Sequence, residues 1–289
     1  MSTHRCPICN LDISQYDDEK RWSHVNKCLL DQENNASLQP VLTKTQETAI
    51  SICNRRAQIF SSAVTDHVTS KLVSLGYSEN DLPILEKYFE TKVRFVIHIR
   101  IENALQHILK DEFYRNLFEV GRSGGATNQY ARKAWEDNLF NRVYANSPGW
   151  ERVKYCALNL TCDAMGSPAI GYGESFMVIR REVHDRISFC VGDSSRCETH
   201  MATFKYPLIV FNLISRDLLK ELLDLAKTGK RTYPSHYMEY LEGQIHGPVS
   251  IKRDIESLHV PKRYQHNADI MQKLSEFVKL YNIPIIFYD

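Results

Sequence analysis

The chain has 289 residues, of which 43% are hydrophobic and 25% charged, and its formal net charge is +1. This composition is typical of a globular protein, and the balanced charge excludes a broad basic surface for nucleic acid. No apolar run approaches the roughly 20 residues of a membrane span, and the first residues lack an apolar stretch of signal-peptide type. We therefore expect a reducing compartment, cytoplasmic or nuclear, in which the eight cysteines are thiols or metal ligands.

Four potential metal ligands lie close to the N-terminus. Cys6 and Cys9 form a Cys-x-x-Cys pair, and after fourteen residues His24 and Cys28 follow, four positions apart. Three thiolates and one imidazole suit tetrahedral Zn²⁺, and one helix face can present residues that are four apart. We predict a zinc finger over residues 1–32, whose folding free energy comes mostly from the metal. The alternative is four scattered residues in a flexible tail.

This segment resembles the ubiquitin-binding zinc fingers of DNA-repair proteins, in which Cys-Pro-x-Cys precedes a helix that ends in His-x-x-x-Cys-Leu. The matching residues here are Cys6-Pro7-Ile8-Cys9 and His24 to Leu29. Those fingers often carry an Asp that contacts ubiquitin two residues before the last Cys, where this chain has Asn26. The resemblance implies ubiquitin or a ubiquitinated protein as the partner, with DNA or another protein as alternatives.

A polar segment without periodicity follows, and we predict a linker over residues 33–44 and a second domain over residues 45–289. Its helical N-terminal part, residues 45–91, contains two helices. Apolar residues recur at helical spacing from about Thr45 to Leu75, with Gly76 as the stop signal. The second helix begins near Asn80 and ends near Phe89.

Alternating apolar residues and helix caps predict the remaining elements. The helices are expected over residues 102–110, around Trp135, over 215–227 between a Ser215 cap and a Gly229 stop, and over 267–281. The strands are expected over residues 92–101, with His98 and Arg100 on the polar face, and over 154–160, 171–179, 186–191 and 283–289. This order predicts an α+β fold, a mixed β core with packing helices.

Three stretches contain candidate site residues. Glu242, Gln244 and His246 alternate along a predicted strand, so their side chains share one face, which is either a site or an exposed polar edge. Ser123 and Gly124 belong to a glycine-containing loop that either places backbone N–H groups near an anion or forms an ordinary turn. Asn159, in a buried strand, needs hydrogen-bond partners and either ties the fold together or meets a ligand.

Several segments between about Val93 and Val260, among them Lys154 to Leu160 and Glu242 to Val249, resemble segments of a domain family of uncharacterised function, DUF3626. The family departs from this chain at Cys156, where it has Gly, and at Ile99-Arg100, where it has Pro-Asp. The matching segments are Tyr114-Arg115 through Gly121, Ser123-Gly124-Gly125, Trp135-Glu136, Lys154 to Leu160, Gly192-Asp193-Ser194 and Glu242 to Val249.

The family is similar to divergent mono-ADP-ribosyltransferases related to bacterial effectors that ADP-ribosylate ubiquitin on threonine. The resemblance implies an ADP-ribosyltransferase-like core and NAD as a substrate. Transferases of the Arg–Ser–Glu type present an early Arg, a central strand with small polar residues and a late Glu; Arg115, the Tyr155–Asn159 strand and Glu242 follow this order. The implied catalytic residues are Glu242, Gln244 and His246, and the implied NAD-binding residues are Arg115, Ser123, Gly124, Tyr155, Asn159 and Tyr172.

The chemistry implied for these residues is as follows. Cleavage of the nicotinamide–ribose bond passes through an oxocarbenium-like state, whose charge the Glu242 carboxylate stabilises. Gln244 orients the acceptor or the ribose, and the planar guanidinium of Arg115 suits the pyrophosphate. Tyr155 or Tyr172 stacks on nicotinamide. The structural alternative is an ion pair between Arg115 and Glu242.

These inferences favour an NAD-dependent mono-ADP-ribosyltransferase that acts on ubiquitin or on a ubiquitinated protein recruited by the zinc finger. Two alternatives remain. One is a non-enzymatic ubiquitin-binding adaptor with a degenerate transferase fold, and the other is a glycohydrolase of NAD or a nucleotide sugar.

Overall fold

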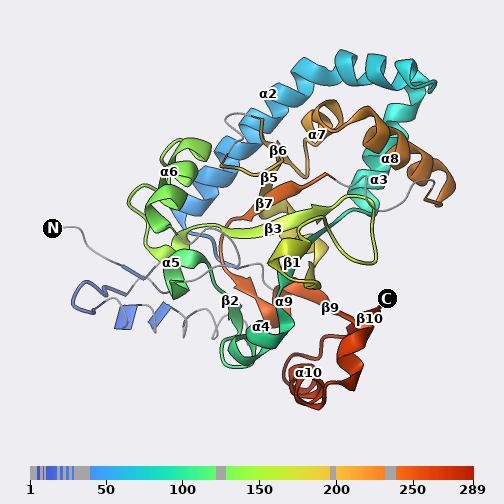
Figure 1. Ribbon diagram of the computed structural model, residues 1–289. Helices are drawn as coiled ribbons and strands as arrows, with labels where there is room; N and C mark the ends of the chain where they lie inside the picture. The colour runs from blue at the N-terminus through green and yellow to red at the C-terminus, as the bar shows by residue number, and fades with distance from the viewer. Residues whose placement is uncertain are drawn as a thin grey trace.

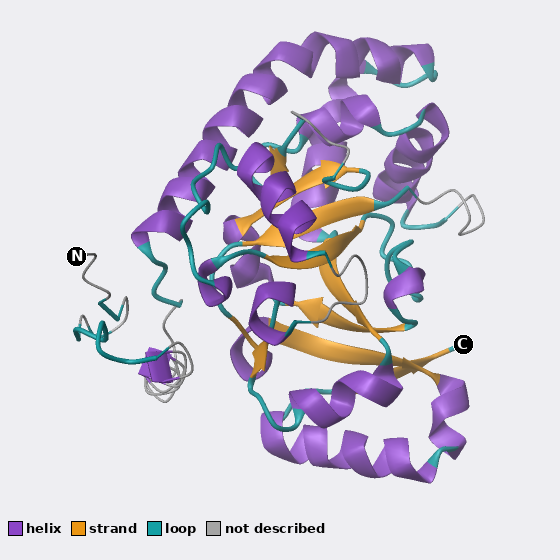
Figure 2. Cartoon of the chain, turned by 60° about the vertical axis from the view of Figure 1, so that its left-hand side comes forward, coloured by secondary structure: helices purple, strands orange, loops and turns teal. Residues whose placement is uncertain are grey.

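A mixed sheet of eight strands forms the centre of the computed structural model, and helices cover it (Figures 1 and 2). The structure describes residues 5–6, 9, 11–17, 20–21, 24–25, 28, 40–121, 128–195, 200–231 and 239–289. The predicted site residues Ser123 and Gly124, the finger residues Pro7, Ile8 and Asn26, and linker residues 33–39 lie outside these ranges.

The strands of the large sheet lie in the order β10-β9-β4-β1-β3-β7-β5-β6. Neighbouring strands are antiparallel except for the parallel pair of β9 and β10. A second sheet consists of the antiparallel pair β2 and β8. The strand bounds are β1 Arg94–Ile99, β2 Phe113–Tyr114, β3 Lys154–Asn159, β4 Ser175–Ile179, β5 Ile187–Val191, β6 Ala202–Thr203, β7 Leu241–Ile245, β8 Val249–Ser250, β9 Ile255–Pro261 and β10 Ile285–Tyr288.

The long helix α2 lies near the β6 end of the sheet, and α10 lies near the β10 end (Figure 1). The α-helices are α2 Lys44–Ser74, α3 Leu82–Thr91, α4 Ile101–Ile108, α5 Leu117–Val120, α6 Gln129–Leu139, α7 Leu208–Leu213, α8 Arg216–Thr228, α9 Ile251–Asp254 and α10 Ala268–Tyr281. The 3₁₀ helices are η1 Glu79–Asp81, η2 Gly149–Glu151, η3 Ile170–Tyr172, η4 Arg181–Arg186 and η6 Lys262–His266.

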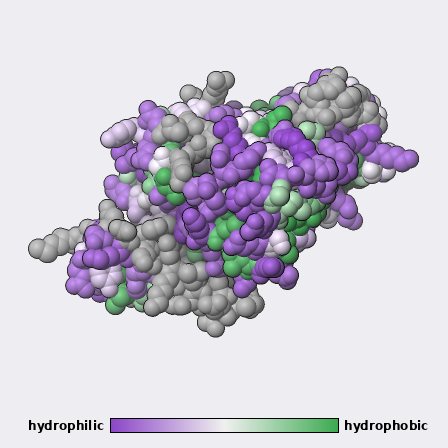
Figure 3. Space-filling view, turned by 60° about the horizontal axis from the view of Figure 1, so that its bottom comes forward, coloured by the Kyte–Doolittle hydropathy of each residue, from purple (hydrophilic) through white to green (hydrophobic). Residues whose placement is uncertain are grey.

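Aromatic side chains join one face of the sheet to the helices on it. The Phe189 ring of β5 lies 5.3 Å from the Phe95 ring of β1 and 5.8 Å from the Phe89 ring of α3, measured between centroids. The Phe211 ring of α7 contacts Phe89 edge-on at 5.8 Å. These fully or almost fully buried rings belong to the main hydrophobic core. On the face shown in Figure 3, hydrophilic residues predominate and hydrophobic ones gather near the centre.

The α+β class and most elements predicted from the sequence are confirmed. Ser215 caps α8 through its side chain, and Gly229 ends that helix in the left-handed conformation. Asn267 caps α10 in the same way as Ser215 caps α8. None of the described helices is both long enough and apolar enough to cross a membrane.

One prediction about a strand is wrong in detail. Residues 171–179 do not form one strand, because β4 begins only at Ser175 after the 3₁₀ helix η3. Gly173 separates the two elements with φ +141°, and a Cβ atom there would lie 2.1 Å from the backbone of Ile99. The chain therefore turns at a glycine that packs directly on the end of β1. His98, which was placed on the polar face of its strand together with Arg100, is buried under this turn, and its Nδ1 lies 2.8 Å from the Gly173 carbonyl.

The N-terminal finger residues contact the larger domain. Cys6, Ile13 and Val25 form a buried apolar cluster with Phe113 of β2, and Trp150 of η2 packs against it. The N-terminal segment is therefore in contact with β2, the strand that also leads into Arg115.

Candidate functional site

The strand β7 places Glu242, Gln244 and His246 on one face, as their alternation predicts. Of the two alternatives, an exposed polar edge is excluded, since β7 lies between β3 and β5 and every residue of it is buried. Burying three polar side chains requires hydrogen-bond partners from neighbouring elements. The three residues find different partners, and of the three only Glu242 lines the large cavity of the described molecule.

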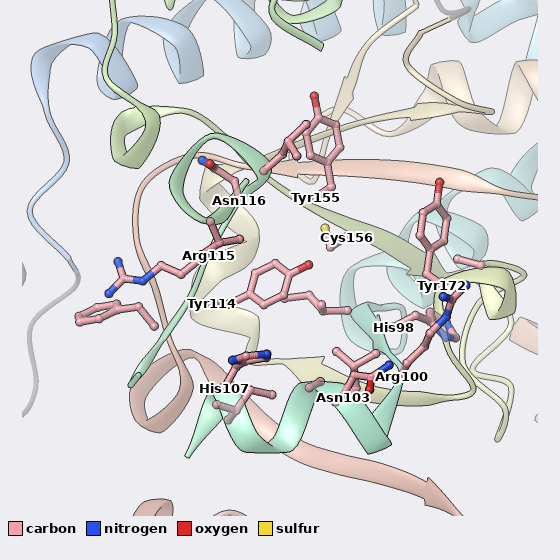
Figure 4. A pocket seen from close by; sticks show the side chains of 18 of the residues that line it. His98, Arg100, Asn103, His107, Tyr114, Arg115, Asn116, Tyr155, Cys156 and Tyr172 are labelled. Atoms are coloured by element: carbon pink, nitrogen blue, oxygen red, sulfur yellow. The ribbon is translucent and has the colours of Figure 1, made fainter. Parts of the chain in front are cut away.

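This cavity has a volume of about 610 Å³, within the range of ligand pockets. Its floor is one face of the sheet, since Val96 of β1 pairs with Ala157 of β3, and Ala157 pairs with Glu242 of β7. Helix α4 and the segment from Phe113 to Phe118 form walls. Figure 4 shows Tyr155 and Tyr172 at the side where Cys156 lies, and His107 and Asn103 on α4 at the opposite side.

Three hydrogen-bond donors hold the Glu242 carboxylate. Ser194 Oγ donates a short bond to Oε1, Gln244 Nε2 donates to the same oxygen at 3.3 Å, and the Tyr240 hydroxyl donates to Oε2 at 3.2 Å. The residue is only 3% exposed. A carboxylate fixed by three donors at the floor of a cavity is preorganised to meet developing positive charge.

Burial raises the pKa of the Glu242 carboxyl group, and the nearby Asp193 carboxylate adds to the rise. The hydrogen bonds from Ser194 and Gln244 and the positive charge of Arg132 act in the opposite direction. Desolvation thus destabilises the ionised form, while the surrounding donors restore it in part.

Arg132 of α6 is the guanidinium that the structure brings near Glu242. Its Cζ lies 4.2 Å above the Tyr155 ring centroid, its side chain lines the cavity, and it is 9% exposed. Its Nε atom is buried and has no hydrogen-bond partner among the described residues. A buried guanidinium with a donor left over at a cavity wall is available to an anionic ligand.

The predicted pyrophosphate residue Arg115 is placed differently. Its guanidinium donates to the Asp111 carboxylate at 2.6 and 2.7 Å and to Glu119 at 3.4 Å. Figure 4 shows it directed away from Tyr155 and Tyr172. These two carboxylates already pair with the guanidinium N–H donors of Arg115 that the sequence analysis assigns to the pyrophosphate. The structure brings Arg132, rather than Arg115, near Glu242.

The two predicted stacking residues, Tyr155 and Tyr172, both line the cavity. The Tyr155 hydroxyl donates to Glu136 at 3.2 Å, which fixes its ring beneath Arg132. Burial raises the pKa of Tyr172, and the charge of Glu242 adds to this rise. Glu242, Tyr155, Tyr172 and Arg115 are therefore the predicted site residues that line this cavity, and the Arg115 guanidinium is paired with Asp111 and Glu119 there.

Asn159 lies at the other end of β3 and does not line this cavity. Its side-chain amide donates to the Asp163 carbonyl at 2.9 Å and accepts from the Asp163 N–H at 2.8 Å. Both polar ends of the amide are used to close the turn after β3. Of the two roles left open by the sequence, the structure favours the one in which Asn159 ties the fold together.

Gln244 and His246 are part of the protein interior, and both are completely buried. The Gln244 amide lies between Glu242 and Ser188, and the His246 ring lies between Ser188 and Tyr144. Burial lowers the pKa of His246 to about 3, and the Arg186 charge contributes in the same direction. The imidazole is therefore neutral near pH 7.

Sequence reasoning missed three contributors to the site. Ser194 lies in the predicted Gly-Asp-Ser turn and Tyr240 directly before β7, but neither residue was predicted to contact Glu242. Arg132 carried no local signal, because an Arg on a charged helix is ordinarily solvent-exposed. Its role becomes visible only when α6 is placed over β3.

The four predicted metal ligands are brought together at the N-terminus. One ligand atom from each of Cys6, Cys9, His24 and Cys28 lies within 4.8 Å of the others. The Nε2 atom of His24 is 3.2 Å from Cys9 Sγ and 3.5 Å from Cys28 Sγ. Three thiols and an imidazole at these separations fit a tetrahedral site for Zn²⁺, whose bonds to sulfur are about 2.3 Å long.

None of the curated proteins compared with this chain matches it. Residues 97–227 match the model of a family described as protein of unknown function (DUF3626). The matched region includes Arg115, Tyr155, Asn159 and Tyr172 and ends before Glu242. The match lies within the region from Val93 to Val260 that resembles this family in sequence, and it agrees with that resemblance.

Proposed function

We propose that the protein is an NAD-dependent mono-ADP-ribosyltransferase whose reaction takes place in the cavity above Glu242. The observation that supports this most is a buried carboxylate, held by three donors, at the floor of a cavity of about 610 Å³ with tyrosine rings in its wall. Such a cavity offers aromatic surface for a flat base and a fixed negative charge for a cationic transition state.

In the proposed reaction, the bond between nicotinamide nitrogen and ribose C1 breaks, and its electron pair leaves with nicotinamide. The ribose becomes oxocarbenium-like, and an acceptor hydroxyl attacks C1 and releases its proton. Glu242 lies where a negative charge stabilises the positive ribose in the transition state more than in the ground state. The nicotinamide of bound NAD is itself cationic, so binding of NAD also favours the ionised form of Glu242.

Arg132 takes the role of the phosphate-binding residue in this proposal. Its free Nε donor and its fixed position over Tyr155 support a charge-assisted contact with one of the NAD phosphates. The ring of Tyr172 or Tyr155 would stack on nicotinamide. Arg115 has a supporting role, since it joins Asp111 to Glu119 beside the cavity.

We further propose that the finger binds Zn²⁺ and brings ubiquitin or a ubiquitinated protein to this cavity. The contact of Cys6, Ile13 and Val25 with Phe113 supports this, because Phe113 also lines the cavity. A protein held by the finger would therefore be near the wall of the proposed reaction site.

The test is to incubate the full chain with NAD and ubiquitin and to examine ubiquitin by mass spectrometry. We expect the mass of ubiquitin to rise by one ADP-ribosyl group, and fragmentation to place it on a single side chain. Ubiquitin of unchanged mass, together with NAD that is fully recovered, would contradict the proposal and favour a non-enzymatic adaptor. Consumption of NAD without modified ubiquitin would favour a glycohydrolase or another acceptor.

A further inference from the structure

Five buried side chains form a continuous chain of hydrogen bonds that starts at Glu242 and runs away from the cavity. Gln244 Nε2 lies 3.3 Å from the Glu242 carboxylate, and Gln244 Oε1 lies 3.0 Å from Ser188 Oγ. Ser188 Oγ lies 3.1 Å from His246 Nε2, and His246 Nδ1 lies 2.8 Å from the Tyr144 hydroxyl. The five residues are at most 3% exposed.

The direction of every bond in this chain follows from the chemistry of its members. A carboxylate only accepts, so the Gln244 NH₂ group faces Glu242 and the Gln244 oxygen faces Ser188. The Ser188 hydroxyl has one hydrogen, which it donates to that oxygen, and it must then accept from His246 Nε2–H. His246 is consequently the Nε2–H tautomer, and its Nδ1 accepts from the Tyr144 hydroxyl.

We propose that Gln244, Ser188, His246 and Tyr144 are positioning residues whose hydrogen bonds all point toward Glu242 and fix its carboxylate for the reaction. The catalytic consequence of this inference rests on the proposed function, but the hydrogen-bond chain among the five side chains exists without NAD. Bonds aligned in one direction polarise one another, so the last donor, Gln244 Nε2–H, is stronger than an isolated amide. Such a donor favours the ionised form of Glu242.

Other groups also act on Glu242 and must be kept unchanged in a test. The titratable or charged groups that face it are Asp193 after β5, Arg132 of α6, Tyr172 of η3, Tyr240 beside β7, and Tyr155 and Cys156 of β3. His246 is faced by Arg186, whose Nη1 donates to the His246 carbonyl at 2.8 Å, and the buried Cys53 thiol of α2 faces Ser188 and Tyr144. Replacement of Ser188 interrupts the hydrogen-bond chain and leaves these other contacts in place. It does not alter the cavity, because Ser188 is not part of the cavity lining.

The chain also implies how Glu242 and His246 are coupled. If Glu242 takes up a proton on the oxygen that faces Gln244, the carboxyl group becomes a hydrogen-bond donor. The Gln244 amide must then turn over so that its oxygen accepts this hydrogen bond. Ser188 then receives a hydrogen from Gln244 and donates to His246 Nε2, which moves the ring proton of His246 to Nδ1. With the proton on that oxygen of Glu242, the imidazole stays neutral but changes its tautomer: its Nδ1–H now donates to the Tyr144 oxygen, and the Tyr144 hydroxyl hydrogen turns away from the ring.

The experiment is nuclear magnetic resonance on the full chain without NAD. The ¹⁵N shifts of the His246 ring identify its tautomer, and ¹³C shifts of the Glu242 carboxyl follow its titration. We expect the Nε2–H tautomer near pH 7 and a change of tautomer in the same pH range as the Glu242 titration. An Nδ1–H tautomer or an imidazolium near pH 7 would overturn the proposal without any variant.

Ser188→Ala removes the central link, and Ser257→Ala is its matched control. Ser257 is 6% exposed, and its Oγ lies 3.1 Å from His259 Nε2, which resembles the Ser188–His246 contact but has no link to Glu242. In Ser188→Ala we expect the Glu242 titration to move to higher pH and kcat to fall about tenfold, with the KM for NAD unchanged. Ser257→Ala should change neither.

Equal Glu242 titration curves in the two variants would overturn the positioning role. The two spectroscopic measurements need no catalytic activity, so their failure is distinct from the failure of the proposed transferase function. A wild-type protein that leaves NAD intact, but shows the expected tautomer and titration, would contradict the proposed function alone.

Discussion

Replacement of Glu242 by Gln separates a catalytic carboxylate from a structural one. The change keeps the size of the side chain and leaves one oxygen that can accept from Ser194, while it removes the negative charge. If that charge stabilises the oxocarbenium-like transition state, the loss falls on kcat more than on NAD affinity. We expect kcat to fall by about 10²–10³, which corresponds to roughly 2.7–4 kcal/mol for one preorganised electrostatic group.

The structure also limits the effect of this substitution on stability. Glu242 is held by neutral donors, and burial already raises the pKa of its carboxyl group, so the ionised form gains little from folding. The variant loses a hydrogen bond worth about 1 kcal/mol, which for a domain of this size lowers Tm by about 2–4 °C. A structural ion pair would instead strand a buried charge and cost about 3–5 kcal/mol.

The assay measures turnover of NAD and Tm on one preparation of the wild type and of each variant. Glu221→Gln serves as the matched control, because Glu221 is 1% exposed, pairs with Arg231 and lies outside the cavity lining. The control should lower Tm and keep wild-type turnover. A Glu242→Gln protein whose turnover per folded molecule equals that of the wild type would refute the catalytic assignment. If its Tm is also much lower than that of the wild type, the role of Glu242 is structural.

Three other predictions follow from the same geometry. The chain should bind one Zn²⁺, and metal analysis should find less than one equivalent in Cys9→Ser; zinc-free wild type would contradict this. In calorimetry, Arg132→Gln should weaken NAD binding by about 1.5–3 kcal/mol, whereas Arg115→Gln should change the stability of the protein more than its affinity for NAD. A larger loss of NAD affinity in Arg115→Gln than in Arg132→Gln would show that Arg115 is the residue that binds the NAD phosphates. The free energy of unfolding should fall as the pH drops from about 6.5 toward 3, since the unfolded state protonates His246 first. In urea unfolding, His246→Gln should reduce the decrease of this free energy between pH 7 and 4.5 by about 2–3 kcal/mol. The same decrease in the variant and the wild type would contradict the pKa of about 3 for His246.

The elements with strong local signals were predictable from the sequence. A side-chain cap and a glycine stop bound α8, and Asn267 bounds α10, because these interactions involve residues a few positions apart. The shared face of Glu242, Gln244 and His246 also follows from alternation alone. Four cysteine and histidine ligands at characteristic spacing likewise predict their own proximity.

What alternation could not show is where the polar face of β7 points. That depends on pairing with β3 and β5, which lie far away in the sequence, and on partners such as Ser188 and Tyr144 that come from other elements. The surroundings of Arg115 and Arg132 could not be predicted either, because the family resemblance selects Arg115 and an Arg on a charged helix, such as Arg132, carries no local signal. In the structure, the carboxylates of Asp111 and Glu119 pair with the Arg115 guanidinium, whereas Arg132 lies over the Tyr155 ring.

The measurement that tests the proposed function most directly uses NAD with one label on nicotinamide and another on adenine. The full chain is incubated with this NAD and ubiquitin, and free and protein-bound labels are counted. We expect equal amounts of free nicotinamide label and ubiquitin-bound adenine label, both greatly reduced in Glu242→Gln. If both labels stay together in intact NAD, the transferase assignment is contradicted.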